Sequence, residues 1–179
     1  MIYQDFSTPD DAFELALHMK SKDRFEIALF GLDPLMALLY PFRANRPNTI
    51  TWTIFDGKKP IAMWGCVPIK GHTTKATCWF LSGEDVMKNM RFLRQTKRAF
   101  NWTISHYQHL HNFVTEEQTQ TIRWLKWLGF KFQNEPLLVK NVKVRYFYYE
   151  SCEKTQVEPI DDLCGPIWKT RMNQTMDNS

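Results

Sequence analysis

The sequence lacks a long apolar run. The longest one, from Ala28 to Leu39, is interrupted by Asp33 and Pro34. A membrane-spanning helix needs roughly 20 consecutive apolar residues. The pattern therefore predicts no membrane span.

Cysteine is also scarce, and its spacing gives no Cys-x-x-Cys pair of the kind that binds zinc. The chain has four cysteines, namely Cys66, Cys78, Cys152 and Cys164. The first residues do not resemble an export signal, because aspartates stand where a cationic segment and an apolar core would be required. We interpret the cysteines as reduced thiols of a cytoplasmic protein.

Acidic residues are absent from one long stretch, residues 86–115. Within it, five cations fall in eleven positions, namely Lys88, Arg91, Arg94, Lys97 and Arg98. The whole chain has 179 residues, 44% hydrophobic and 23% charged, with a net charge of +4. These values are typical of one compact domain and exclude collagen, coiled coil and full disorder. They allow attraction to nucleic acid or acidic proteins without requiring it.

The first forty residues predict three helices. Ser7, Thr8 or Asp10 can cap the first, which carries an apolar stripe up to Met19. A second covers about residues 23–30. The third begins at Asp33-Pro34 and is expected to stop at Pro41.

From residue 48 the pattern changes to strands. Alternating β-branched and aromatic residues precede Asp56-Gly57, a strong hairpin signal. Further strands are expected over residues 60–67 and 75–81, the latter with Ala76, Cys78 and Phe80 on one face. A long helix over 91–107, a strand over 110–115, a helix over 118–128 ending at Gly129, and strands over 130–134 and 142–150 follow.

This order predicts an α/β fold with one mixed sheet covered on both faces, because strand–helix–strand passages require parallel neighbours. We divide the chain into a domain over residues 1–150 and a C-terminal extended arm over residues 151–179. The arm carries prolines, little periodicity and the isolated apolar pair Ile167-Trp168. Such a segment either folds back on its own domain or docks on a partner.

The helix that ends in Leu128-Gly129-Phe130, just before a strand, resembles the last conserved segment of GNAT N-acyltransferases. A narrower resemblance rests on blocks in the order Asp23-Arg24, residues 31–34 (Gly-Leu-Asp-Pro), 62–65 (Ala-Met-Trp-Gly), 78–81 (Cys-Trp-Phe-Leu) and 122–125 (Ile-Arg-Trp-Leu). Together they resemble a family of GNAT-like bacteriophage proteins that includes the small internal virion protein of short-tailed phages. The resemblance implies a single-domain, GNAT-like acyl-CoA N-acyltransferase fold.

In GNAT enzymes acetyl-CoA lies between two splayed parallel strands, and a glycine-rich turn at a helix N-terminus holds its diphosphate. Gly83 is the only glycine between Leu81 and Phe92, so that turn is missing here. The resemblance places Leu125 where enzymes of the fold commonly keep a tyrosine. If the chain nevertheless binds acetyl-CoA, the candidate residues are Trp79, Phe80, Leu81, Arg91 and Arg94, the last two as side-chain phosphate ligands. The two arginines equally fit the solvated face of an amphipathic helix.

Glu116 and Glu117 follow the strand over 110–115 and are the candidate catalytic residues, as a general base for a substrate amine. In the first turn of the next helix, the same two side chains would simply stabilise its positive end.

Two further clusters have ordinary explanations. His106, His109 and His111 are closely spaced, but no cysteine or carboxylate lies within a few residues, so we predict no metal site. The aromatic run over residues 146–149 can stack nucleobases or, as in most sheets, form core packing.

We therefore favour a phage-encoded virion-associated or assembly protein on a degenerate GNAT scaffold, without a cofactor. Its expected partners are other phage structural proteins, met through residues 151–179, and its expected location is the virion or the host cytoplasm. The first alternative is an acetyl-CoA-dependent N-acyltransferase that modifies a host protein or a small amine. The second is a module that binds nucleic acid or a host protein.

Overall fold

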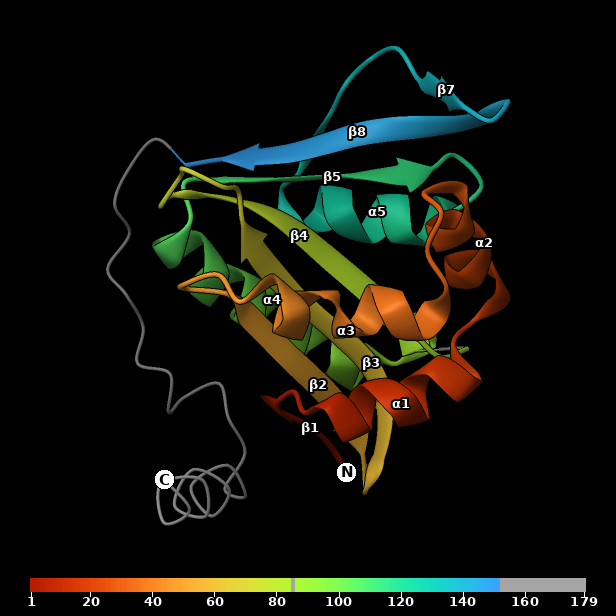
Figure 1. Cartoon of the computed structure of the whole chain (residues 1–179), viewed down its shortest axis with the longest axis vertical. Helices are drawn as coiled ribbons and strands as arrows, with labels where there is room; N and C mark the ends of the chain where they lie inside the picture. The colour runs from red at the N-terminus through yellow and green to blue at the C-terminus, as the bar shows by residue number, and fades with distance from the viewer. Residues whose placement is uncertain (85, 152–179) are drawn as a thin grey trace.

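The computed structural model describes residues 1–84 and 86–151. The predicted arm lies outside the described residues except for Ser151, as do Cys152 and Cys164. In chain order the elements are β1 (Ile2–Phe6), α1 (Pro9–His18), α2 (Ser21–Leu29), α3 (Pro34–Ala44), β2 (Ile50–Asp56), β3 (Lys59–Pro68), β4 (Lys75–Ser82), the 3₁₀ turn η1 (Val86–Lys88), α4 (Met90–His106), β5 (His109–Thr115), α5 (Thr119–Leu128), β6 (Lys131–Phe132), β7 (Leu137–Val139) and β8 (Val142–Glu150) (Figure 1).

The strands form one mixed sheet in the order β1-β2-β3-β4-β5-β8-β6, with β7 on β8. Helices α1 and α3 cover one face, and α4 and α5 cover the other (Figure 1). This arrangement confirms the mixed α/β fold expected from the sequence. Strands β4 and β5 are parallel, and the other strand pairs are antiparallel.

The second strand–helix–strand passage differs from the expectation. Strands β5 and β6 are not neighbours, because β8 inserts between them and is antiparallel to both. An antiparallel strand from the end of the domain can pair with two parallel strands at once. The long β8 therefore fixes the position of the short β6.

The N-terminus contains a strand that the sequence pattern did not predict. Strand β1 pairs with β2, where Phe6 stacks on Trp52 at 4.3 Å between ring centroids and Tyr3 stacks on Phe55 at 5.1 Å. These partners lie some fifty residues away, so no local pattern indicates them. The short β7 was likewise not predicted.

The helix caps follow the sequence, with one correction. Thr8 caps α1 in a capping box, and the Asp33 carboxylate caps α3 by accepting from the Met36 N–H at 2.9 Å. The expectation that Pro41 ends α3 was wrong, since the helix continues to Ala44. Burial of its apolar face against α1 and β3 outweighs the single intrahelical bond that a proline removes.

Strand β4 alternates as predicted. Ala76, Cys78 and Phe80 face α4 and α5, whereas Trp79 and Leu81 pack with α1 and α3. Gly65 on β3 lies beneath the Trp79 indole. A Cβ at Gly65 would lie 2.2 Å from the Ile50 carbonyl oxygen and 3.0 Å from Trp79 Nε1, so only glycine fits.

We expect Gly65→Ala to lower the free energy of unfolding by about 3 kcal/mol, because β2 must move away to make room for the methyl group. Gly83→Ala is the matched control, since its Cβ would make ordinary contacts at 3.4 and 3.5 Å with two carbonyl oxygens. The control should change stability by less than about 1 kcal/mol. Urea denaturation measures both, and equal effects of the two substitutions would contradict the steric explanation.

Candidate functional site

The candidate site is the gap that opens between the parallel strands β4 and β5. The strands pair over only three positions, Lys75 with His109, Ala76 with Leu110 and Thr77 with His111. At the next position Asn112 Nδ2 donates to the Cys78 carbonyl at 2.7 Å, so a side chain replaces the backbone pairing. Beyond this point the two strands diverge.

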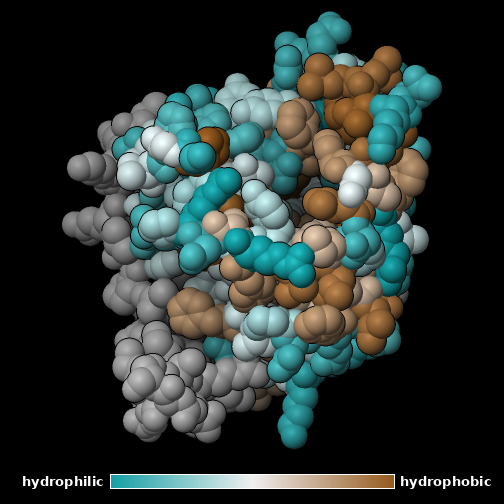
Figure 2. All heavy atoms as spheres, viewed as in Figure 1, coloured by the Kyte–Doolittle hydropathy of each residue, from teal (hydrophilic) through white to brown (hydrophobic). Residues whose placement is uncertain are grey.

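A cavity of about 360 Å³ lies at this divergence and borders both faces of the sheet. Thr96, Trp124 and Leu125 line it on the side of α4 and α5. Phe30 and Tyr40 line it on the side of α2 and α3. A hollow in the middle of that second face is visible in Figure 2. The walls are mostly apolar.

The end of β4 in the gap is held by a carboxylate. Asp23 on α2 is 3% exposed; its Oδ2 accepts from the Ser82 N–H at 2.9 Å. Its Oδ1 accepts from Gln118 Nε2 at 2.8 Å and lies 3.2 Å from the ammonium of Lys20. Burial raises the pKa of Asp23, and the Lys20 charge opposes that rise.

The end of β5 is held in the same way, one helical turn further along α2. Glu26 Oε2 accepts from the Thr115 N–H at 3.3 Å, from the Thr115 hydroxyl at 3.1 Å and from Gln118 Nε2 at 3.1 Å. Burial raises the pKa of Glu26. We call Asp23, Glu26 and Gln118 the carboxylate clasp, because together they join the two diverging strand ends to α2.

Aromatic rings occupy the opposite side of the gap, beneath α4 and α5. The Phe80 ring centroid lies 5.0 Å from that of Trp124 and 5.7 Å from that of Phe92. Trp124 Nε1 donates to the Thr96 hydroxyl at 3.1 Å, which ties α5 to α4. Phe80 and Trp124 border the cavity, and Phe92 packs behind them.

The N-terminus of α4 already has its own cap. Asn89 Oδ1 accepts from the Arg91 N–H at 3.0 Å and the Phe92 N–H at 3.3 Å. The Gly83 N–H donates to the Ile61 carbonyl at 2.9 Å. These backbone donors are therefore used within the protein, whereas a phosphate site needs such groups pointing at the ligand.

The structure brings some of the candidate cofactor residues together. Trp79, Phe80 and Leu81 border the cavity, on both of its sides. Arg91 and Arg94 lie exposed on α4 and do not border it.

The two candidate bases also lie away from the cavity. Glu116 Oε1 accepts from Arg145 Nε at 2.8 Å and forms an ion pair with the same guanidinium. Glu117 is exposed, and its carbonyl accepts from the Lys22 ammonium at 3.3 Å. Both precede α5, which begins at Thr119, so the expectation of first-turn carboxylates was wrong. The preceding turn forms because the Gln118 N–H donates to the Thr115 carbonyl.

Two thiols, Cys66 and Cys78, and the side chain of Leu125 also lie beside the gap. Burial raises the pKa of Cys78 to about 12 and that of Cys66 well above its usual range. Neither thiol provides a thiolate nucleophile at neutral pH. Leu125, at the position that the resemblance assigns to a tyrosine, is 5% exposed and borders the cavity.

The histidines are separated. His106 packs against Trp102 at the end of α4, with the two rings tilted by 40°, whereas His109 and His111 lie on β5. Within residues 1–84 and 86–151, no group of three or more histidine, cysteine or carboxylate side chains is placed to hold a metal ion.

The described part of the chain holds no single helix with the length and apolarity to cross a membrane. Helices α2 and α3, bent by 63° at their junction, pass that test only when taken together.

Solved structures of other proteins share the fold of this chain. An acetyltransferase of the GNAT family from Streptococcus pneumoniae has a TM-score of 0.63 at 15% identity, covering 84% of this chain and 99% of its own. Spermidine N-acetyltransferase from Vibrio cholerae, in complex with CoA and spermine, has a TM-score of 0.62 at 12% identity, covering 83% and 95%. The fold is that of the GNAT acetyltransferases.

At the level of sequence, residues 61–136 match the family described as "Bacteriophage T7, probable scaffold protein Gp13". This segment runs from β3 to just beyond β6 and is less than half of the chain. The similarity agrees with the expected relation to phage proteins. No curated protein matches the chain.

Sequence patterns do not predict the clasp. Asp23 is part of the family resemblance, Gln118 is predicted only as the start of a helix, and Glu26 has no predicted role. A local signal exists, because Asp23 and Glu26 are three residues apart and flank the same helix face as Ile27, which packs toward the core. Two carboxylates beside an apolar stripe indicate buried partners.

The raised pKa of Glu26 predicts a pH dependence of stability. The folded state holds this proton more tightly than the unfolded chain, whose carboxyl keeps its ordinary pKa of 4.5. The stability contribution of Glu26 is therefore complete below that pH and falls as the pH rises toward the raised value. Glu26→Gln keeps an acceptor for Thr115 but cannot ionise. Relative to wild type, this variant should gain stability between pH 4 and pH 7, as measured by urea denaturation at each pH.

Glu26→Ala is the control for the hydrogen bonds. It leaves the Thr115 N–H and Gln118 Nε2 without this acceptor and should cost about 1–3 kcal/mol at every pH. A Gln variant whose stability follows wild type across the range would show that the Glu26 proton is not bound as described.

Proposed function

We propose that this chain is a phage virion-associated or assembly protein that uses a GNAT scaffold for architecture and not for acyl transfer. Its partners are other phage structural proteins, and it acts in the particle or in the host cytoplasm during assembly. The similarity of residues 61–136 to the phage family supports the setting. The hydrogen bonds that already occupy the strand ends at the gap between β4 and β5 support an architectural role.

The carboxylate clasp is the observation that carries the proposal. A GNAT enzyme uses the gap between its diverging strands to hold the acyl-CoA arm. Here the Ser82 and Thr115 N–H groups at the strand ends already donate to Asp23 and Glu26. These two N–H groups therefore offer no free donor to an acyl-CoA arm.

The helix that would bind the diphosphate supports the same conclusion. Asn89 accepts from the Arg91 and Phe92 amides at the start of α4. Arg91 and Arg94 can attract phosphate from solution, but they do not border the cavity. Attraction without a cradle gives weak, salt-sensitive binding.

Mass spectrometry of purified particles and assembly intermediates, from cells infected by a phage that encodes this chain, tests the proposal. We expect the protein at a fixed ratio to the other structural proteins. Deletion of its coding region should reduce the yield of infectious particles. Absence from both particles and intermediates would refute an architectural role.

A second candidate is an acetyl-CoA-dependent N-acyltransferase, because the 360 Å³ cavity remains open between the strands. Trp79, Phe80 and Leu81 would then contact the acyl arm, with phosphates on Arg91 and Arg94. Glu116 or Glu117 would serve as base only after Arg145 releases Glu116 or the turn before α5 moves. The acceptor would be a host protein or a small amine.

A thermal shift assay separates the two candidates. A ligand at 100 times its dissociation constant stabilises a protein by about 2.7 kcal/mol, or about 5–10 °C for a chain of this size. We expect no shift with millimolar acetyl-CoA. A shift that Thr121→Phe abolishes, by filling the cavity beside Trp124, would favour the enzyme.

A further inference from the structure

The face of β5 and β8 that looks toward α2 and α3 carries an uninterrupted set of rings. The register places His109, His111 and Phe113 on β5 opposite Glu150, Tyr148 and Tyr146 on β8. Their neighbours in sequence, Phe147 and Tyr149, point the other way into the core. The aromatic run of β8 is thus divided between a core face and an outer face.

Each ring of the outer face contacts the next one along the face. Centroid distances are 5.5 Å between His109 and His111, 5.7 Å between His111 and Tyr146, and 5.8 Å between Tyr146 and Tyr148. Phe113 continues the set at 5.3 Å from Tyr146. All five are only partly buried, and we call them the ring platform.

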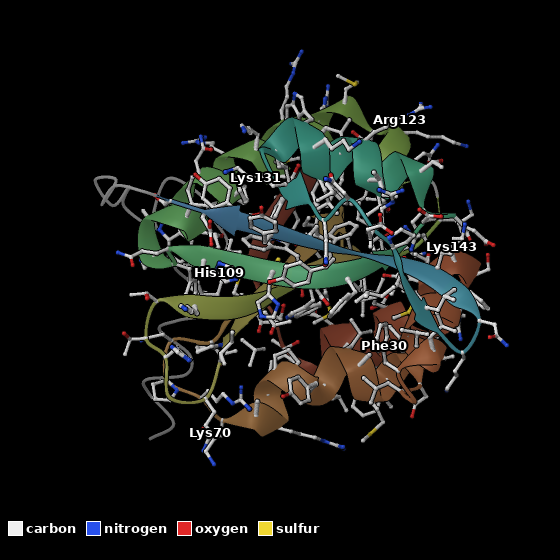
Figure 3. All side chains as sticks on the ribbon, turned by 90° about the horizontal axis from the view of Figure 1, so that it is seen from above. Phe30, Lys70, His109, Arg123, Lys131 and Lys143 are labelled. Atoms are coloured by element: carbon white, nitrogen blue, oxygen red, sulfur yellow. The ribbon has the colours of Figure 1, made fainter. Side chains whose placement is uncertain are left out.

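No helix packs over the platform within the described residues. Helices α1 and α3 pack on β3, and α2 reaches only its far end, where Phe30 lies 6.4 Å from Phe113. Figure 3 shows His109 at one end of this face and Phe30 at the other. Among the residues that the structure describes, the part of the platform from His109 to Tyr146 and Tyr148 therefore has no helix packed on it.

Cations border the end of the platform near His109. Lys75 pairs in register with His109, and Lys70 lies exposed in the adjacent β3–β4 turn (Figure 3). The sequence has no acidic residue over 57–83 or over 86–115, the stretches that supply β3, this turn, β4 and β5. Among the strand residues of this face, Glu150 is the one carboxylate, and it faces His109 Nδ1 at 3.4 Å.

His111 adds a polar atom that lacks a hydrogen-bond partner among the described residues. Its Nδ1 is buried and has no hydrogen-bond partner among the described residues, while Nε2 lies 3.5 Å from the Thr77 hydroxyl. Burial and the neighbouring His109 lower the pKa of His111, so the ring is neutral at pH 7 and offers a flat stacking surface.

We propose that the ring platform binds single-stranded nucleic acid, with bases stacked on Tyr146, Tyr148 and His111 and the backbone beside Lys70 and Lys75. Partly exposed rings in a row beside an acid-free, cationic border are the combination by which proteins hold single strands without reading sequence. A peptide partner would not need the cations, and duplex DNA would not expose its bases to the rings. The platform adjoins the gap, since Phe113 also borders the cavity, but Tyr146, Tyr148 and His111 do not border it. The inference therefore does not depend on the proposed function.

Fluorescence anisotropy with a labelled 12-nucleotide oligothymidine tests this directly, on the full chain at about 50 mM salt. We expect binding that is tighter than to a duplex of the same length and that weakens as salt is added. Replacing both tyrosines, Tyr146→Leu with Tyr148→Leu, should weaken it by at least about 25-fold, since one stacked ring is worth fivefold or more. Tyr146→Phe with Tyr148→Phe keeps the rings and should bind within about threefold of wild type.

The lysines have a matched control pair at the start of β3. Lys70→Glu with Lys75→Glu should weaken binding at least tenfold and flatten its salt dependence. Lys58→Glu with Lys59→Glu makes the same charge change at the opposite end of β3 and should have the smaller effect. These surface variants should fold normally, as a thermal melt would show.

Three results would overturn the proposal. One is no binding of the oligonucleotide by the full chain. The second is equal weakening by the two lysine pairs, which would reveal attraction by net charge alone. The third is full binding by the leucine variants together with loss in Arg91→Glu with Arg94→Glu, which would place the site on α4.

Discussion

The Ser82 and Thr115 N–H groups donate to two carboxylates of α2, and these hydrogen bonds hold the diverging ends of β4 and β5 against that helix. Where parallel strands diverge, their backbone groups lose their partners and must find others. Asp23 and Glu26 supply these partners, and Gln118 bridges the two side chains. Without them, the Ser82 and Thr115 N–H groups would have no partner at the open end of the sheet.

The clasp has a cost that the surrounding residues offset. Two carboxylates so close together repel each other, and burial disfavours their charge. Lys20 neutralises one of them, and three donors approach Glu26. Arg24 holds the same segment by donating to the Met19 and Ala16 carbonyls at the end of α1. The pair Asp23-Arg24, which contributes to the phage resemblance, is thus explained by the joining of α1, α2 and the sheet.

Much of the fold could be predicted from local sequence. The hairpin at Asp56-Gly57, the caps at Thr8 and Asp33, the left-handed Gly129 and the alternation of β4 are each set by residues within a few positions, and all are confirmed. The strands β1 and β7 and the insertion of β8 depend on pairing with distant segments. The residues near each of these strands do not indicate which distant strand it pairs with.

The site was predictable only in part, for the same reason. The family resemblance implies Trp79, Phe80 and Leu81 as cofactor-contacting residues, and in the structure all three border the cavity in the gap. Arg91, Arg94, Glu116 and Glu117 were chosen for their chemistry, and the structure places them outside the cavity. The catalytic and phosphate-binding roles assigned to them stay predictions of the enzyme candidate.

A crystal structure determined in the presence of millimolar acetyl-CoA tests the central claim most directly. The account predicts that Asp23 and Glu26 keep their contacts with Ser82 and Thr115 and that Asn89 still caps α4, with no ordered cofactor between β4 and β5. An ordered CoA there, with its diphosphate on the Arg91 and Phe92 amides, would contradict the account.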